Sequence, residues 1–505
     1  MYALSNVSEL FESYFATFIL DNEDLKKPIN LRCLGLISFF NTFPYKNKQL
    51  AKSVLSDFNI DYYKFIEIID KLEDVELLNR QFGHVKIPEQ NLANFLFYKA
   101  FIDRELLAFG KLLVKYFDNN TDRFKDCVVS ANNTFGPRKV KDKIQPDLRK
   151  YLNSIKSDEN KAFEFLTTFW FYLQSETLDF LLNKINHLPN SDKDFVIEND
   201  NKSWGSNSDQ YIDLLSSFYI FLDNLNDALY LSLQYIRKKP DVLYILIDKI
   251  ERKLTFDSRD YYSGFKRQQI LFNIIIDGLE KGDKLCRILF YELSKTFLKF
   301  RYNQTKSGKG RQIYWYDIKT PNVKPIREFR KNIWLTIIDQ FEDNQNNSLT
   351  VLNDYAPNSP FKIKEIMEFD LQYILRIIDE YLAPSIFGHC LYVHKQIDTF
   401  RRNEINRDEF TEYLNLFTNS TYILYEKLDW NKLNGKKRFE LDIETSYDEL
   451  KEQEIRSFVD FSDKNDVKLF FDRYHFLIKK IENNNTFNRT LDFIVDESFN
   501  IDIEY

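Results

Sequence analysis

The sequence has one cluster of soft metal ligands, which consists of His389, Cys390 and His394 in the run GHCLYVHKQ. On a helix, positions four apart share a face, so Cys390 and His394 could bind one metal ion together. A structural zinc site needs four ligands, normally supplied by two paired motifs. The chain has no second pair of Cys or His, so we expect these side chains to be packed or hydrogen-bonded and we expect no metal site.

A phosphate-binding loop of the form G-x-x-x-x-G-K-[ST] is missing from the sequence. The nearest approach is Ser-Gly-Lys-Gly at residues 307–310, where Asn303 occupies the first glycine position and no Ser or Thr follows the lysine. No G-x-S-x-G nucleophile motif is present either. Acid pairs such as Glu449 and Glu452 have the spacing of solvated helix faces. We therefore expect no catalytic residue, no cofactor and no enzyme activity.

The strongest local charge lies in residues 301–331, which hold nine basic residues against two acidic ones, a net charge of +7. Two interpretations remain open for this segment. In one, it is a solvated loop whose Trp315 and Trp334 pack into the core. In the other, it contacts an acidic partner or a nucleic acid, because Trp and Tyr beside Arg suit interface hot spots. The candidate partner-binding residues are Arg311, Trp315, Tyr316, Lys319 and Lys324.

The elements that would position these residues are mainly helices, because apolar residues recur with a period near 3.6 along most of the chain. Twelve glycines and twelve prolines among 505 residues leave few tight turns, which argues against a sandwich or barrel. Residues 226–250 are typical of one TPR- or HEAT-like helical hairpin, although no strict 34-residue repeat is present. The 47 phenylalanines and 30 tyrosines match an AT-rich codon bias, so we do not interpret them as a binding signature.

The N-terminal part has the pattern of a winged helix. Apolar helical segments at residues 29–40, 48–58 and 61–75 are followed by two short strands, at 77–79 and 85–87, with a turn near Phe82 and Gly83. Three short helices and a hairpin form a recurrent supersecondary unit. The third helix is acidic, with five acids against two lysines, so we expect no binding of duplex DNA, whose affinity comes from neutralised phosphates.

We predict an all-α fold, with an N-terminal winged helix followed by an irregular α-solenoid of TPR/HEAT-like helical hairpins and a few short strands. A chain of this length exceeds the roughly 250–300 residues of one hydrophobic core. Continuous helices are expected over residues 159–187 and 408–428, and strands over 312–318, 439–443 and 491–503. The expected domains are a linker helix (1–28), the winged helix (29–88), a helical domain (89–190), a helical-repeat array (206–300), a basic loop with a strand (301–322), a second helical-repeat array (323–430) and an acidic C-terminal region (431–505).

Several of these segments resemble bacterial STAND NTPases, the large signal-transduction ATPases that include the antiviral Avs type. The runs LRCLGLISFFNTF (31–43) and VKIPEQNLANFLFYKAFID (85–103) look like the winged-helix region of that family. The run SNVSELFESYFATFI (5–19) resembles the helix that links the ATPase to it. DKLCRILFYELSKTFLKF (283–300), RQIYWYDIK (311–319) and IREFRKNIW (326–334) are similar to sensor arms. The resemblance covers about residues 5–400, and the missing phosphate loop departs from the family.

The resemblance implies the sensor and regulatory portion of a STAND-type signalling protein in antiphage defence, without its own ATPase. Its expected partners are a protein ligand of phage origin, bound on the concave face of the helical array near residues 301–331, and an ATPase subunit supplied in trans. One alternative is a helical-repeat scaffold for protein–protein interaction with no immune role. Another is a nucleic-acid-binding regulator.

Charge and hydropathy narrow the class of protein further. Residues 441–505 hold sixteen acids against eight bases, a net charge of −8. No window reaches about 18 uninterrupted apolar residues, so we expect no membrane span. The N-terminus lacks the basic start of a signal peptide, and the four cysteines lie far apart, as is usual for reduced thiols. These features predict a cytoplasmic protein.

Overall fold

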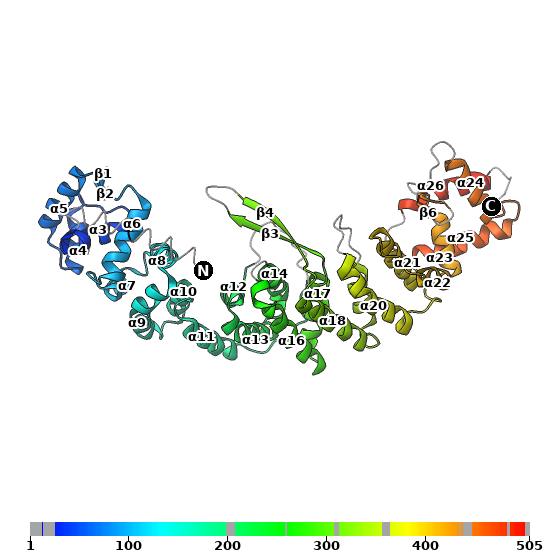
Figure 1. Cartoon of the computed structure of the whole chain (residues 1–505), viewed down its shortest axis with the longest axis horizontal. Helices are drawn as coiled ribbons and strands as arrows, with labels where there is room; N and C mark the ends of the chain where they lie inside the picture. The colour runs from blue at the N-terminus through cyan, green and yellow to red at the C-terminus, as the bar shows by residue number, and fades with distance from the viewer. Residues whose placement is uncertain are drawn as a thin grey trace. The chain divides into compact units, whose positions relative to one another are not determined.

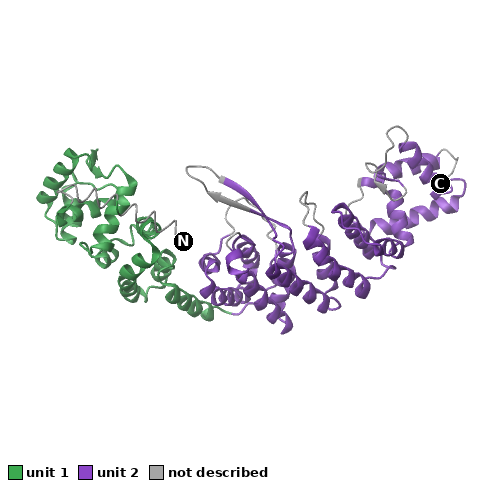
Figure 2. Ribbon diagram, in the orientation of Figure 1, with its two compact units in different colours: residues 1–189 green, residues 190–505 purple. Residues whose placement is uncertain are grey.

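The computed structural model describes residue 13 and residues 26–197, 208–257, 260–307, 313–355, 364–433, 436–437, 447–481 and 485–499. The chain divides into two compact units, Met1–Pro189 and Asn190–Tyr505 (Figure 2). The described residues form helices almost throughout, with three two-stranded sheets, so the predicted all-α helical-repeat class is confirmed (Figure 1). The expected linker helix over residues 1–28 lies almost wholly outside the described residues.

The first unit consists of short helices and one small hairpin. Its elements are α3 (Pro28–Phe40), α4 (Lys48–Asp57), α5 (Tyr62–Asp74), β1 (Asn79–Gln81), β2 (His84–Lys86), α6 (Gln90–Phe97), the π-helical segment η1 (Tyr98–Asp103), α7 (Phe109–Tyr116), α8 (Thr121–Phe135), α9 (Pro137–Ile155), α10 (Glu159–Phe169) and α11 (Gln174–His187).

The first five elements have the predicted order of three helices and a hairpin, and their bounds agree with the sequence pattern within about two residues. Strands β1 and β2 pair antiparallel, and Gln81 faces His84 across a two-residue turn of Phe82 and Gly83. Asn47 and Asp61 cap α4 and α5 by accepting from the backbone N–H three residues on. That these elements form a winged helix remains a proposal.

An aromatic core holds this unit together. The ring of Phe39 on α3 lies 4.8 Å from that of Phe124 on α8 and 6.3 Å from that of Phe97 on α6, measured between ring centroids. Helix α3 approaches η1 so closely that a Cβ on Gly35 would lie 2.3 Å from the Cβ of Ala100. Only glycine leaves room for this contact, so Gly35 sets the spacing between α3 and η1.

The prediction of one helix over residues 159–187 is wrong, because α10 ends at Phe169 and α11 begins at Gln174. The backbone N–H groups of Tyr172 and Leu173 both donate to the carbonyl of Phe169, at 2.9 and 3.1 Å, and close a turn. Tyr172 and Leu173 are buried. Because the apolar pattern continues through the turn, periodicity alone does not reveal the break.

The second unit is a longer helical array that carries a projecting hairpin. Its elements are α12 (Gln210–Ser217), η2 (Phe218–Ile220), α13 (Leu222–Lys238), η3 (Pro240–Val242), α14 (Leu243–Leu254), α15 (Asp260–Ser263), α16 (Lys266–Glu280), α17 (Lys284–Phe297), β3 (Arg301–Ser307), β4 (Ile313–Lys319), α18 (Lys324–Asp339), α19 (Gln345–Asp354), α20 (Lys364–Tyr381), α21 (Phe387–Arg402), α22 (Glu409–Leu416), α23 (Ser420–Leu428), β5 (Lys432–Leu433), β6 (Lys436–Lys437), α24 (Tyr447–Phe458), α25 (Lys464–Ile478), η5 (Asn485–Phe487) and α26 (Asn488–Phe499).

Helices in this unit pack against direct sequence neighbours, as α16 does with α17, and also against helices two or more elements away, as α18 does with α20. Helix α14 lies between α12 and α17, and α17 in turn contacts α19. Helix α13 packs against α12 and α16, so the expected close hairpin of α13 with α14 (residues 226–250) is not the principal contact of either helix. Helix α16 also packs against α18, where the ring centroids of Phe272 and Phe329 are 4.9 Å apart. The array is therefore an irregular two-row helical repeat.

Three further predictions need correction or lie outside the described residues. The helix expected over 408–428 is divided into α22 and α23, and Asn419 caps α23 by accepting from the N–H of Tyr422 at 2.9 Å. Of the tail expected as a strand over 491–503, the described part, up to Phe499, lies in helix α26, because Thr490, Ile494 and Ser498 form one buried helical face. The strand expected at 439–443 lies outside the described residues.

Candidate partner-binding site

The segment predicted as a loop with one strand is a two-stranded antiparallel hairpin. Strand β3 pairs with β4 over seven residues each, from Arg301 opposite Lys319 to Ser307 opposite Ile313. The sequence RYNQTKS of β3 is polar and is a weak strand predictor. Its strand conformation comes from pairing with the aromatic β4, since β propensity depends on the neighbouring strand.

Strand β4 presents three consecutive aromatic residues to solvent. Because side chains alternate along a strand, Tyr314 and Tyr316 lie on one face and Trp315 lies on the other. The ring centroids of the two tyrosines are 6.3 Å apart. Tyr314, Trp315 and Tyr316 are 48%, 77% and 46% exposed. Three adjacent exposed aromatic side chains form a contiguous apolar surface of the kind found at interfaces, so this hairpin is the principal candidate site.

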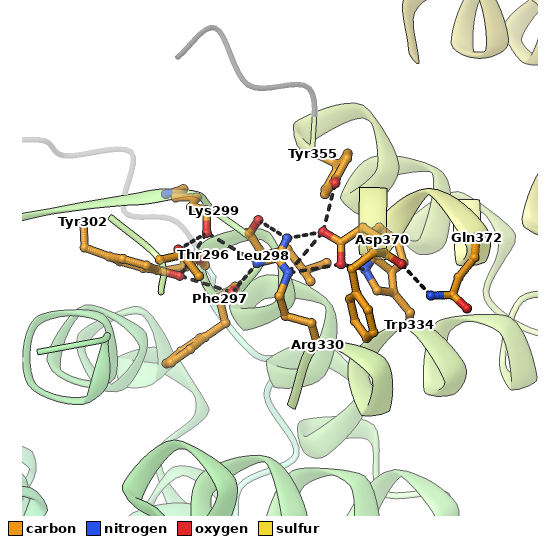
Figure 3. A network of polar contacts seen from close by, with 12 residues as sticks. Thr296, Phe297, Leu298, Lys299, Tyr302, Arg330, Trp334, Tyr355, Asp370 and Gln372 are labelled. Carbon is orange, nitrogen blue, oxygen red and sulfur yellow. Dashed lines mark hydrogen bonds and ion pairs between the residues drawn. The ribbon is translucent and has the colours of Figure 1, made fainter. Parts of the chain in front are cut away.

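The base of the hairpin is fixed to the C-terminal end of α17 (Figure 3). The buried hydroxyl of Tyr302 lies 3.1 Å from the carbonyl oxygens of both Thr296 and Phe297. Directly after β4, the hydroxyl of Thr320 donates to the carbonyl oxygen of Lys299 at 2.9 Å. These bonds satisfy carbonyls that a helix end leaves without intrahelical partners. Burial raises the pKa of Tyr302, so its hydroxyl remains a donor.

The same helix end is held by a completely buried ion pair. Arg330 on α18 donates through Nη2 to the carbonyl of Leu298 at 3.0 Å and binds the carboxylate of Asp370 on α20. Asp370 also accepts from Trp334 Nε1 at 3.0 Å and from the Tyr355 hydroxyl at 2.9 Å. Burial, followed by the charge of Asp370, raises the pKa of Tyr355. The base of the hairpin is therefore attached to a buried network of hydrogen bonds and one ion pair, and this network joins α17, α18, α19 and α20.

The structure separates the basic residues of residues 301–331 into different roles. Arg330 is internal and neutralised, and Arg301 forms an ion pair with Asp317 across the hairpin. Lys319 and Lys324 are exposed, and their contact with a partner stays a prediction. Lys324 begins a row on α18 with Arg327 and Lys331, at helix positions i, i+3 and i+7, which share one face. The surface charge is thus smaller than the sequence count indicates.

Of the remaining site residues predicted from the sequence, Arg311 lies outside the described residues. Trp315 and Tyr316 are on the exposed strand β4. The two tryptophans differ, because Trp334 is fully buried and Trp315 is 77% exposed. The burial of Trp334 agrees with the first interpretation and the exposure of Trp315 does not, and contact of Trp315 with a partner stays a prediction.

The histidine–cysteine cluster is occupied by hydrogen bonds within the chain. His389 Nδ1 accepts from the N–H of Ala383 at 2.9 Å, and the Cys390 thiol donates to the carbonyl of Pro384 at 3.2 Å. The ring of His394 stacks on Tyr422, with centroids 4.1 Å apart. Burial lowers the pKa of His389 and of His394. Within the described ranges, no group of three or more His, Cys, Asp or Glu side chains is placed to hold a metal ion.

Asp370, Tyr355 and the internal role of Arg330 were not predicted from the sequence. One signal could have indicated them. Asp370 lies between Met367 and Leu371 on the buried stripe of its helix, and a carboxylate there needs a buried partner. The sequence does not say which of the chain's 70 Lys and Arg residues that partner is.

A scan against protein-family models, and searches of curated proteins and of solved structures, gave no match to this chain. Among the described helices, none combines the length and the apolar character that a membrane crossing requires. The hairpin, the basic face of α18 and the network below them are therefore the observations from which a function can be argued.

Proposed function

We propose that this chain is the sensor and regulatory portion of a STAND-type signalling protein that recognises a protein ligand through the hairpin β3–β4. The observation that carries this proposal is Trp315, which is 77% exposed between two exposed tyrosines on a ribbon whose base is rigidly anchored. An aromatic side chain on a fixed support loses little conformational entropy on binding, which favours a hot spot.

The assignment to STAND proteins and to antiphage defence rests on the sequence resemblance described above. It includes the winged-helix nature of α3–α5 with β1–β2, a ligand of phage origin and an ATPase subunit acting in trans. The exposed bases Lys319, Lys324 and Arg327 favour an acidic ligand surface, which would be attracted at long range. Association should therefore slow as the salt concentration rises.

The test is capture of purified phage proteins by the full chain and by three variants. Trp315→Ala should reduce capture at least about thirtyfold, since a hot-spot truncation costs about 2 kcal/mol or more. A triple charge reversal, with Arg311, Lys319 and Lys324 each changed to Glu, should slow association. The matched control is Tyr230→Ala, which removes a 54% exposed aromatic side chain from α13 and should leave capture unchanged.

All three variants should melt at the wild-type temperature, because exposed substitutions usually change stability by less than about 0.5 kcal/mol. Undiminished capture by folded Trp315→Ala and by the charge-reversed variant would exclude this hairpin as the ligand site. Capture of host proteins instead of phage proteins would favour the scaffold alternative. An ATPase reading frame directly upstream of the gene would favour the STAND assignment.

A further inference from the structure

The turn between β1 and β2 combines two features that folding alone does not favour. Phe82 has a φ of 49° and Gly83 a φ of 80°, so both residues of the turn are left-handed. Two-residue hairpin turns of this kind favour Asn-Gly, and a bulky residue in the left-handed region is an outlier. The Phe82 side chain is also 99% exposed. Strain and solvent exposure at one residue make the Phe82 ring a candidate for contact with a ligand.

Cationic and aromatic side chains continue from this turn across α4 and the start of α5. The N–H of Lys46 donates to the carbonyl of Gly83 at 3.2 Å, which places exposed Lys46 beside the turn. The ammonium of Lys48 donates to the Tyr63 hydroxyl at 3.1 Å. Lys52, one helical turn along α4, lies 5.4 Å from the Tyr63 ring centroid. We name Lys46, Lys48, Lys52, Tyr63 and Phe82 the cationic–aromatic surface.

Three of the acidic residues of α5 form ion pairs away from this surface, whereas Asp61, the N-cap of α5, lies close enough to Tyr63 to raise its pKa against the effect of the lysines. Asp70 and Glu73 both bind Arg80 on β1, and Glu67 binds Lys64 at 2.7 Å. Three of the five acids that argued against nucleic-acid binding are therefore paired within the third helix and the hairpin. The Lys48 hydrogen bond, followed by the charges of Lys48 and Lys52, lowers the pKa of Tyr63, as expected in a cationic environment.

We propose that the cationic–aromatic surface binds single-stranded nucleic acid. Exposed rings of Phe82 and Tyr63, which is 63% exposed, can stack on unpaired bases, while three lysines neutralise phosphates. Lysine is depleted in protein–protein interfaces, so a surface in which every cation is lysine fits a phosphate backbone better. A duplex keeps its base faces stacked internally, so the rings favour single strands over double strands.

The test is fluorescence anisotropy of a labelled 20-nucleotide oligo(dT) with the full chain at 50–200 mM KCl. Three neutralised phosphates on a single strand predict a slope of log affinity against log salt of about −2. A 20-base-pair duplex should bind more weakly than oligo(dT). No binding of oligo(dT) at 50 mM KCl, or a preference for the duplex, would overturn the proposal.

Two variants separate stacking from charge. Phe82→Asn removes the ring but places a residue that tolerates the left-handed conformation, so the fold is retained and oligo(dT) affinity should fall about tenfold. Lys48→Gln with Lys52→Gln should reduce the salt slope by about 1.4. The matched control is Lys150→Gln, an exposed lysine on α9, which should leave affinity and slope nearly unchanged.

A poly-glutamate peptide of the same length serves as a competitor of oligo(dT). It tests whether the surface binds any polyanion by charge attraction alone, as it would bind an acidic protein. It should compete poorly with oligo(dT), because it offers no flat rings for Phe82 and Tyr63. If poly-glutamate competes equally well, or if Phe82→Asn binds oligo(dT) like the wild type, the surface does not recognise nucleic acid by stacking and the proposal is wrong.

Discussion

Replacement of Asp370 by Asn should loosen the four-helix junction below the hairpin without affecting the first unit. The side chains of Asp370 and Arg330 are both 0% exposed, and the carboxylate accepts from Arg330, Trp334 and Tyr355. Asparagine has the same shape but no charge, and its amide nitrogen is a donor that faces other donors. The guanidinium of Arg330 is then left buried without a counter-charge.

The expected magnitude follows from this geometry. Removal of one partner of a buried ion pair costs about 3–5 kcal/mol, because the other charge remains desolvated and unpaired. If the junction opens locally, a loss of 3 kcal/mol increases amide exchange by more than about a hundredfold. Peptides from α17, α18 and α20 should show this increase, because Arg330 also binds the end of α17.

Hydrogen–deuterium exchange with mass spectrometry measures the effect helix by helix, and peptides of the first unit provide an internal reference. The matched control is Glu380→Gln on the same helix, which removes an exposed ion pair with Arg376. Such pairs contribute roughly 0.3–0.5 kcal/mol, so exchange should change less than about threefold. The joint replacement Arg330→Met with Asp370→Leu should exchange more slowly than Asp370→Asn, since it leaves no buried charge.

Unchanged exchange in Asp370→Asn would refute this reasoning, and so would an equal increase in both units. The first result would mean that the ion pair does not hold the junction. The second would mean that the variant acts through global unfolding rather than through the four helices that it joins.

Three further outcomes are expected. Burial lowers the pKa of His394 below its usual 6.5, so the unfolded chain binds a proton that the folded chain does not. Stability should therefore fall as pH decreases below about 6.5, and His394→Phe should show a flatter pH dependence in thermal melts. Gly35→Ala should lower the melting temperature, because its Cβ would lie 2.3 Å from that of Ala100 and overpacking costs about 1–3 kcal/mol. Calorimetry should detect no ATP binding, and micromolar binding that is lost in Lys309→Ala would contradict this expectation.

Sequence reasoning located elements whose signals are local. The N-terminal helices, the turn at Phe82 and Gly83, and the strand containing Trp315 all follow from periodicity, capping residues and turn or β propensity. The helix break at Tyr172 and Leu173 was not predicted, because burial on both sides of the turn continues the apolar pattern.

Whether an individual side chain is buried or exposed was harder to predict from the sequence than the position of a helix or strand. Trp315 and Trp334 lie only nineteen positions apart within one basic, aromatic stretch, and both could equally be contact or core residues. Pairing with β3 carries Trp315 out to solvent, whereas the helix α18 turns Trp334 toward Asp370. Neither arrangement is encoded within a few residues of the tryptophan itself.

The sequence by itself determined the all-α class, most element positions, the absence of a phosphate-loop motif and the presence of a basic aromatic segment. These depend on residue types and short spacings. Only the tertiary structure decided which charges reach solvent and which are neutralised inside. Arg330 and Asp370 are forty positions apart, and their pairing depends on how α18 packs against α20. A buried charge is stable only with such a partner, and the choice of partner belongs to the folded chain as a whole.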